Sequence, residues 1–119
     1  MPTKDEHVQQ AEHNRQFWSS TNVPLTPFVD WVVTGIFYEA VHWVEAFLAS
    51  TGRHSGTHYD RNLAIQDFSQ MNAIRNDFFT LKADSENARY KCERHSAQYI
   101  DSELIPRLNN IERHVRGLL

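Results

Sequence analysis

Residues 27–50 place the strongest constraint on the fold of this chain, because their apolar side chains recur with the period of an α-helix. The members of one broad face are Val29, Val33, Ile36, Phe37, Ala40, Val41, Val44, Phe47 and Leu48. Strand residues alternate with a period of two, whereas this pattern keeps a period near 3.6. Thr26 as N-cap, Pro27 at the first helical position and Gly52 as a stop bound the segment. We therefore expect a long central helix.

Four further helices are predicted from the same periodicity and from capping signals. They cover residues 4–20, 58–69, 71–88 and 96–118. Thr57 followed by Asp60 resembles a capping box, and Pro106 is expected to kink the last segment or to mark its true start. No repeat or linker interrupts the chain, so residues 1–119 are predicted to form one domain. Helices of this length joined by short loops favour an all-α, up-and-down bundle.

Composition argues against several classes of protein. The single cysteine, Cys92, allows no intrachain disulfide, which fits a reducing, cytoplasmic setting. The polar N-terminus is unlike a signal peptide, and Thr34, Glu39 and His42 interrupt the longest apolar run, so no membrane is expected. The net charge is −3, but basic residues gather in the C-terminal third. Any anion site is therefore expected there, although nucleic-acid binders are usually basic overall.

A second face of the central helix carries polar and aromatic side chains. Its members are Trp31, Thr34, Gly35, Tyr38, His42, Glu45 and Ala49. Such a stripe can line a functional site or form a subunit contact. It can also consist of partly exposed side chains that are hydrogen-bonded locally, as buried polar groups normally are. The sequence leaves these three interpretations open.

Two shorter stretches add candidate anion-binding residues. His58 and Arg61 share a face at a helix N-terminus, which favours anions. Arg89 and Tyr90 close the fourth helix, and the planar guanidinium of Arg89 is suited to clamp a phosphate. The alternatives are a solvated loop before a well-capped helix, and a helix-end arginine that bonds backbone carbonyls.

These residues are predicted to converge in space. The cluster consists of Tyr38, His42, His58, Arg61, Arg89 and Tyr90. In an antiparallel bundle the third helix starts beside the end of the second, which places His58 near His42. Arg89 returns to that end only if the chain reverses near Ser69–Asn72. If the third and fourth helices form one rod, the cluster dissolves.

No metal and no cofactor are predicted. His54 and His58 are four residues apart, and Glu39 with His42 forms one Glu-x-x-His pair. A di-iron bundle needs two such pairs with further carboxylates, and a zinc site needs a third ligand. The sequence also contains no Gly-x-Ser-x-Gly nucleophile motif and no glycine-rich phosphate loop.

One long stretch and several residues after it carry a resemblance to a known family. The stretch is Phe37-Tyr38-Glu39-Ala40-Val41-His42-Trp43-Val44-Glu45-Ala46-Phe47-Leu48, and the later residues are Gly52, His54, Thr57-His58, Arg61 and Ser85-x3-Arg89-Tyr90. Together they resemble stand-alone prokaryotic members of the HEPN superfamily. The resemblance spans about residues 28–90. It implies an up-and-down four-helix bundle with an additional short helix, usually a homodimer. Many members are ribonucleases that act without metal through an Arg-x4–6-His motif at the dimer interface. Others are non-catalytic, or pair with a nucleotidyltransferase in toxin–antitoxin modules.

Three Arg/His pairs have the spacing of that motif, although nine arginines and seven histidines make chance matches expected. The preferred pair is Arg89 with His95, because it lies where the last two helices meet. Arg53 with His58 ranks second. The third pair, Arg107 with His114, is predicted to lie on a solvated helix face.

Two functions of different classes follow. The first is a metal-independent ribonuclease, or a toxin-like protein that processes RNA or nucleotides. Its catalytic residues would be Arg89, His95 and His58, with histidine as general acid or base and arginine stabilising the phosphate charge. Its substrate would be bound by Tyr38, His42, Arg61 and Tyr90.

The alternative is a non-catalytic dimeric bundle that binds a nucleotide, a nucleic acid or a partner protein. Histidines that converge on arginine in one cleft favour the first, and scattered histidines favour the second.

Overall fold

The structure, a computed structural model, describes residues 1–119 as helices and connecting loops without any strand. The helices are α1 (Lys4–Ser20), α2 (Val29–Ser50), α3 (His58–Asp67), α4 (Arg75–Tyr90), α5 (Ala97–Tyr99) and α6 (Ile105–Leu118). A 3-10 turn, Ser69–Met71, lies between α3 and α4, and a π-helical turn, Ile100–Leu104, joins α5 to α6. The predicted all-α class is confirmed.

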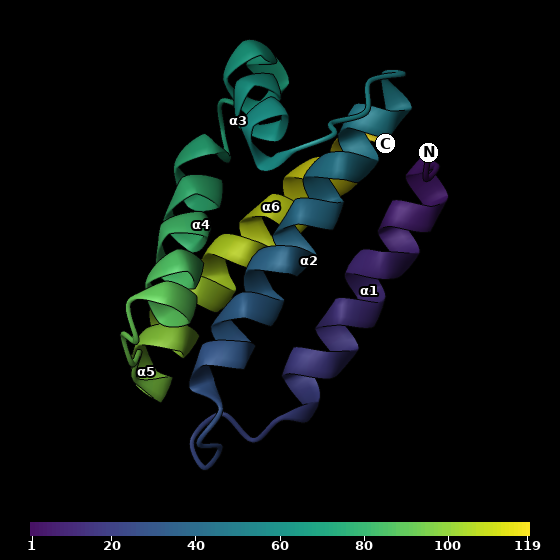
Figure 1. Cartoon of the computed structure of the whole chain (residues 1–119). Helices are drawn as coiled ribbons and strands as arrows, with labels where there is room; N and C mark the ends of the chain where they lie inside the picture. Colours follow the sequence, from purple (N-terminus) through teal and green to yellow (C-terminus); the bar gives the residue numbers. More distant parts are fainter.

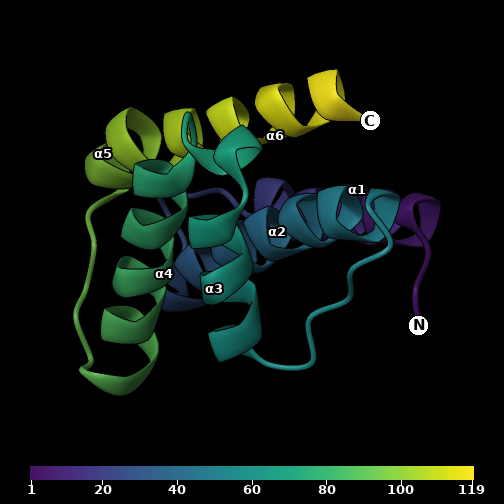
Figure 2. The ribbon, with the colours of Figure 1, turned by 90° about the horizontal axis from the view of Figure 1, so that it is seen from above.

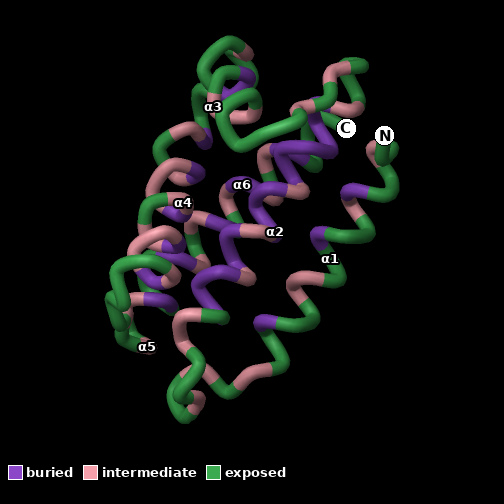
Figure 3. The backbone as a smooth tube through the Cα atoms, viewed as in Figure 1, coloured by how far each residue is buried: buried purple, intermediate pink, exposed green.

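Helix α2 lies at the centre and contacts α1, α4 and α6 (Figure 1). Helix α1 runs antiparallel to α2, because its last turn packs at Gly35 while His7 meets His42. Seen from above, α4 crosses the direction of α2 (Figure 2). Buried residues follow the length of α2 (Figure 3), and Phe37 and Trp43 are among the largest fully buried side chains. The apolar face predicted from the sequence therefore forms the core.

Helix α2 begins at Val29, two residues after the predicted start. Thr26 Oγ1 accepts a hydrogen bond from the Phe28 backbone N–H (3.1 Å), so Thr26 shapes the preceding turn and caps no helix. The predicted stop is confirmed, since Gly52 takes a φ of +82°, which glycine adopts without steric cost. By length and composition α2 is apolar enough to cross a membrane, contrary to the sequence expectation. However, 78% of its most apolar window is buried inside the protein, as expected for a core helix.

Helix α3 begins as predicted, with Thr57 Oγ1 accepting from the Asp60 N–H at 3.0 Å. The reciprocal hydrogen bond of a capping box is not formed, because the Asp60 carboxylate accepts from the Gly56 N–H (3.3 Å) and not from the Thr57 N–H. The chain then reverses, and Arg75 donates to the Ile65 carbonyl (3.1 Å) from the start of α4. This reversal delays the start of α4 by four residues relative to the prediction.

The last predicted helix, residues 96–118, is one helical run with a local change of register. Ser96 caps α5 by accepting from the Tyr99 N–H at 3.0 Å. The π-helical turn follows, and Pro106 occupies the first turn of α6. Proline donates no backbone hydrogen bond, so the α-helical ladder restarts there. Pro106 thus marks the start of α6, one of the two expected outcomes.

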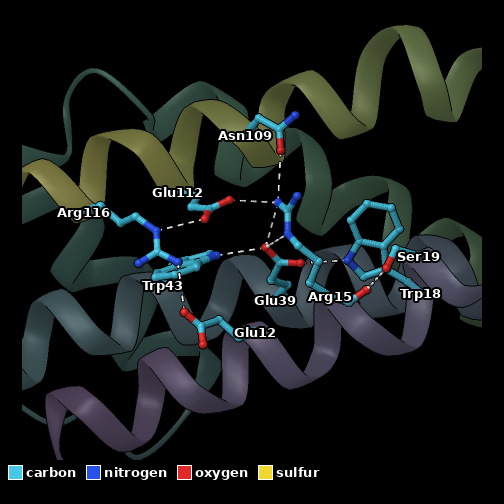
Figure 4. Close-up of polar contacts among 9 residues, drawn as sticks. All are labelled: Glu12, Arg15, Trp18, Ser19, Glu39, Trp43, Asn109, Glu112 and Arg116. Carbon is cyan, nitrogen blue, oxygen red and sulfur yellow. Dashed lines mark hydrogen bonds and ion pairs between the residues drawn. The ribbon is translucent and has the colours of Figure 1, made fainter.

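A buried carboxylate ties α1, α2 and α6 together (Figure 4). Glu39 is fully buried and accepts from Trp18 Nε1 (2.8 Å), Trp43 Nε1 (2.9 Å) and Arg15 Nε (3.0 Å). Arg15 reaches on to Glu112 of α6 at 3.0 Å. These donors give Glu39, a member of the Glu-x-x-His pair in the sequence, a structural role.

Candidate functional site

Two adjoining pockets contain all but one of the predicted site residues. We call the first, of about 310 Å³, the arginine pocket; it is lined by Phe37, Tyr38, His58, Tyr59, Asn62, Lys82, Glu86, Arg89 and Tyr90. We call the second, of about 360 Å³, the histidine pocket; it is lined by Met1, Pro2, His7, Tyr38, Val41, His42, Glu45, His54, Ser55, His58 and Arg61. Because Tyr38 and His58 line both, the two pockets meet at these rings.

The convergence follows from the reversal between α3 and α4. It brings the first turn of α3 beside the last two turns of α4, and both face the middle of α2. The rings of Tyr38 and His58 have centroids 6.3 Å apart, and the Arg89 guanidinium lies 5.5 Å from the Tyr38 centroid. The predicted reversal near Ser69–Asn72 is therefore confirmed, and the six residues gather in one region.

A larger hollow, of about 570 Å³, lies elsewhere between α4 and the end of α6. It is lined by Ala73, Ile74, Asp77, Asn110, Arg113, His114, Gly117 and Leu118. Its carboxylate, Asp77, is already paired with Arg107 at 3.1 Å. We find no cluster of reactive groups there, so size alone does not make this hollow the candidate site.

Arg89 lies at the centre of the arginine pocket. Its guanidinium carbon is 5.9, 5.5 and 5.1 Å from the ring centroids of Phe37, Tyr38 and Tyr90. It donates from Nη1 to Ser85 Oγ, and its buried Nε has no hydrogen-bond partner. It takes part in none of the ion pairs of the chain. The alternative of an arginine that bonds helix-end carbonyls is therefore not what the structure shows.

His58 stands between the two pockets in a defined tautomer. Arg61 Nη1 lies 2.8 Å from His58 Nδ1. A guanidinium only donates, so Nδ1 accepts and the neutral ring carries its proton on Nε2. Partial burial lowers the pKa of His58, and the positive charges of Arg61, Arg89 and Lys82 lower it further. At neutral pH His58 is thus a fixed hydrogen-bond donor.

Arg61, predicted to bind substrate, is held by the protein itself. Its Nε donates to Glu45 Oε1 at 2.7 Å, and both side chains are nearly buried. Ser55 donates its hydroxyl to the same oxygen. These bonds fasten the loop before α3, and α3 itself, onto α2. Arg61 therefore positions His58, and only its remaining N–H groups are available to a ligand.

A pair of histidines in direct contact lines the histidine pocket. His7 Nδ1 and His42 Nδ1 are 3.0 Å apart, so one ring donates and the other accepts. Burial lowers the pKa of His42 to about 4, assisted by the charges of His7 and Arg61. His7 is not among the site residues predicted from the sequence. It lies four residues before Ala11 and eleven before Trp18, the two other buried residues of α1, and this spacing is the signal that could have found it.

The structure does not bring His95 together with Arg89. Its ring stacks on Tyr99, with centroids 5.3 Å apart, and its Nε2 lies 3.6 Å from the Asp84 carboxylate. Asp84 and Arg89 are five residues apart on α4 and so point about 140° away from each other. Since the chain after α4 folds back over the Asp84 face, His95 lies outside both pockets.

The other two Arg/His pairs also lack the expected arrangement. Arg53 is paired with Asp67 at 3.9 Å and does not line the pocket of His58. Arg107 bonds Asp77 of α4, and His114 contacts a backbone carbonyl of the 3-10 turn before α4. The predicted solvated face of α6 is therefore a packing surface against α4.

No group of three or more His, Cys, Asp or Glu side chains is placed to hold a metal ion. Comparisons with known proteins found no matching family model and no similar curated protein or solved structure.

Proposed function

We propose that this protein is a HEPN-like, up-and-down four-helix bundle whose arginine pocket binds the phosphate of a nucleotide or of single-stranded RNA. The observation that carries the proposal is the state of Arg89. Its guanidinium is half-buried among aromatic rings, has no carboxylate partner and keeps a buried N–H unbonded. Desolvating a cation without a counter-ion is costly, so an anionic ligand is the partner that would offset the cost.

The other groups of the pocket suit a phosphate. The planar guanidinium fork offers two parallel donors to phosphate oxygens. His58 adds its Nε2–H, and Lys82 adds an ammonium group. The carboxylate of the pocket, Glu86, is already neutralised by Lys82 at 2.6 Å. The pocket is therefore cationic although the whole chain has a net charge of −3.

Two exposed tyrosines favour a ligand that also carries bases. Tyr59 and Tyr90 line the arginine pocket and are 70% and 75% exposed, far more than packing requires. Bases of single-stranded nucleic acids stack on exposed aromatic rings and on arginine. Phosphate donors flanked by stacking surfaces are thus typical of single-strand recognition.

Binding without catalysis is the function that His58 supports best. A general base needs a free lone pair, but Nδ1 is occupied by Arg61 and Nε2 carries the proton. The second candidate is the metal-independent ribonuclease. It is favoured by the convergence of four histidines with arginine in adjoining pockets, and by a carboxylate, Glu86, beside His58 and Arg89.

The test is binding of a fluorescent, six-nucleotide single-stranded RNA, followed by anisotropy. We expect Arg89→Ala to weaken binding about tenfold or more, since a charge-assisted bidentate contact is lost. The matched control is Arg113→Ala, which removes the same charge from an exposed arginine outside both pockets. Equal binding by wild type and Arg89→Ala would refute the proposal. Loss of intact RNA with wild type, but not with Arg89→Ala, would establish the ribonuclease instead.

We further propose a cytoplasmic homodimer, with a toxin–antitoxin nucleotidyltransferase as the partner that the HEPN resemblance implies. Most of the stripe on α2 does not support the dimer, because Gly35 packs against Trp18 of α1 and Thr34 and Glu45 are buried. Exposed apolar side chains gather instead around the connection from α1 to α2, at Phe17, Leu25, Phe28 and Trp31. A monomer in light scattering at micromolar concentration would exclude the homodimer.

A further inference from the structure

We propose that the histidine pocket holds the base of the nucleotide whose phosphate lies at Arg89, and that it selects bases with an exocyclic amino group, such as adenine and cytosine. This inference rests on the proposed function, because it assigns the second half of the same ligand. It concerns a pocket that phosphate binding leaves unused.

The first step is that the arginine pocket and the histidine pocket are continuous with each other. Tyr38 and His58 line both pockets, so a ligand that leaves the arginine pocket across these rings enters the histidine pocket directly. Each pocket alone lies at the lower end of the range of ~300–1,000 Å³ found for small-molecule sites. Together they offer room for a ligand of two parts.

The second step is the free oxygen of a buried carboxylate. Glu45 is 6% exposed, and its Oε1 already accepts from Arg61 and Ser55. No protein group donates to its Oε2. A carboxylate only accepts, so this oxygen recruits an N–H donor such as an amino group. A carbonyl oxygen at the same position, as in uracil or hypoxanthine, would meet it with like partial charge.

The third step is the histidine pair. One of His7 and His42 donates from Nδ1 and therefore presents a bare Nε2, whereas the other accepts at Nδ1 and presents an Nε2–H. The pair thus always offers one donor and one acceptor. Adenine and cytosine carry an amino donor beside a ring-nitrogen acceptor, which complements this pattern. The low pKa of both histidines keeps the rings neutral, and the pattern intact, at physiological pH.

The experiment compares nucleotides that differ at one position. Calorimetry measures AMP against IMP and CMP against UMP, since each pair exchanges an amino group for a carbonyl. We expect the amino-bearing member to bind about tenfold more tightly, the worth of one hydrogen bond to a charged group. Equal affinities within both pairs would overturn the inference. Ribose 5-phosphate serves as the base-free probe, and its binding as tightly as AMP would also overturn it. If no probe binds, including ribose 5-phosphate and the RNA, the proposed function itself fails.

Variants locate the selectivity. We expect His42→Asn to bring the AMP/IMP ratio close to one while ribose 5-phosphate still binds. The matched control is His13→Asn, because His13 is an exposed histidine of α1 outside both pockets. Glu45→Gln is the second variant. The glutamine amide can donate a hydrogen bond to the carbonyl of IMP, so we expect the affinity for IMP to rise relative to that for AMP. An unchanged AMP/IMP ratio in both variants would refute the assignment. Competition between zinc and AMP in wild type would identify the histidines as metal ligands and also overturn it.

Discussion

Replacing Glu39 by alanine tests whether the carboxylate at the centre of Figure 4 holds the fold together. The carboxylate is fully buried and accepts from two indole N–H groups, those of Trp18 and Trp43, at 2.8 and 2.9 Å. It also pairs with Arg15 at 3.0 Å. Alanine removes every one of these acceptor positions, and Glu39 is the acceptor of both indole N–H groups in the structure.

The expected loss is about 3–5 kcal/mol of unfolding free energy. Each buried indole N–H left without an acceptor costs about 1–3 kcal/mol. Arg15 adds less, because it is one-third exposed and already bonded to Glu112 at 3.0 Å. The sum agrees with the ~3–5 kcal/mol typical of breaking a buried ion pair. Glu39→Gln keeps one acceptor oxygen, so we expect a smaller loss of about 1–3 kcal/mol.

Urea unfolding followed by circular dichroism measures these losses, since fluorescence would also report local changes at the tryptophans. In a domain of this size, each kcal/mol of lost unfolding free energy lowers the melting temperature by about 4 °C. The alanine variant should therefore melt about 12–20 °C below wild type. The matched control is Glu12→Gln, whose carboxylate is half-exposed and pairs with Arg116, so a change below about 0.5 kcal/mol is expected. An alanine variant within 1 kcal/mol of wild type would show that the network contributes packing only.

Three further results are expected. The free energy of unfolding should fall as the pH drops from about 6.5 towards about 4, because His42 binds a proton in the unfolded chain but stays neutral in the folded protein. Urea titrations at several pH values should show this dependence in wild type and a weaker one in His42→Asn. Gly52→Ala should cost about 1–2 kcal/mol because its φ is +82°, whereas Gly117→Ala, with open space around its Cβ, should gain up to about 1 kcal/mol in the same urea assay. Arg89→Met should raise the melting temperature, since a half-buried cation without a carboxylate partner is replaced by an apolar chain; a lower melting temperature would make Arg89 a structural residue.

Much of the fold could be predicted because helical periodicity is a local property. The apolar face of α2, the stop at Gly52 and the cap at Thr57 each depend on a few neighbouring residues. The start of α2 was misplaced because Thr26 can cap a helix or shape a turn, and both use the same hydroxyl. Sequence alone offers no means to choose between two local hydrogen bonds of similar strength.

Convergence of the site was predictable from topology, whereas the partners of its residues were not. Reversal between α3 and α4 places Arg89 near His58 whatever the side chains do. His7 and the bond from Arg61 to Glu45 depend on how α1 and the loop before α3 pack on α2. His95 was misplaced for the same reason, because the path of the chain after Tyr90 decides which face of α4 it meets.

Two charged side chains on α2 and α4 show how scaffold and site differ in this molecule. Glu39 is fully buried, yet Trp18, Trp43 and Arg15 satisfy its oxygens, so its burial costs little and fixes the helices. Arg89 is less buried, yet aromatic rings surround it and one N–H stays unbonded. The same fold leaves Arg89 without a carboxylate partner, although Glu86 lies less than one helical turn away on α4 and pairs with Lys82 instead. The unsatisfied cation is therefore better explained by a ligand than by packing.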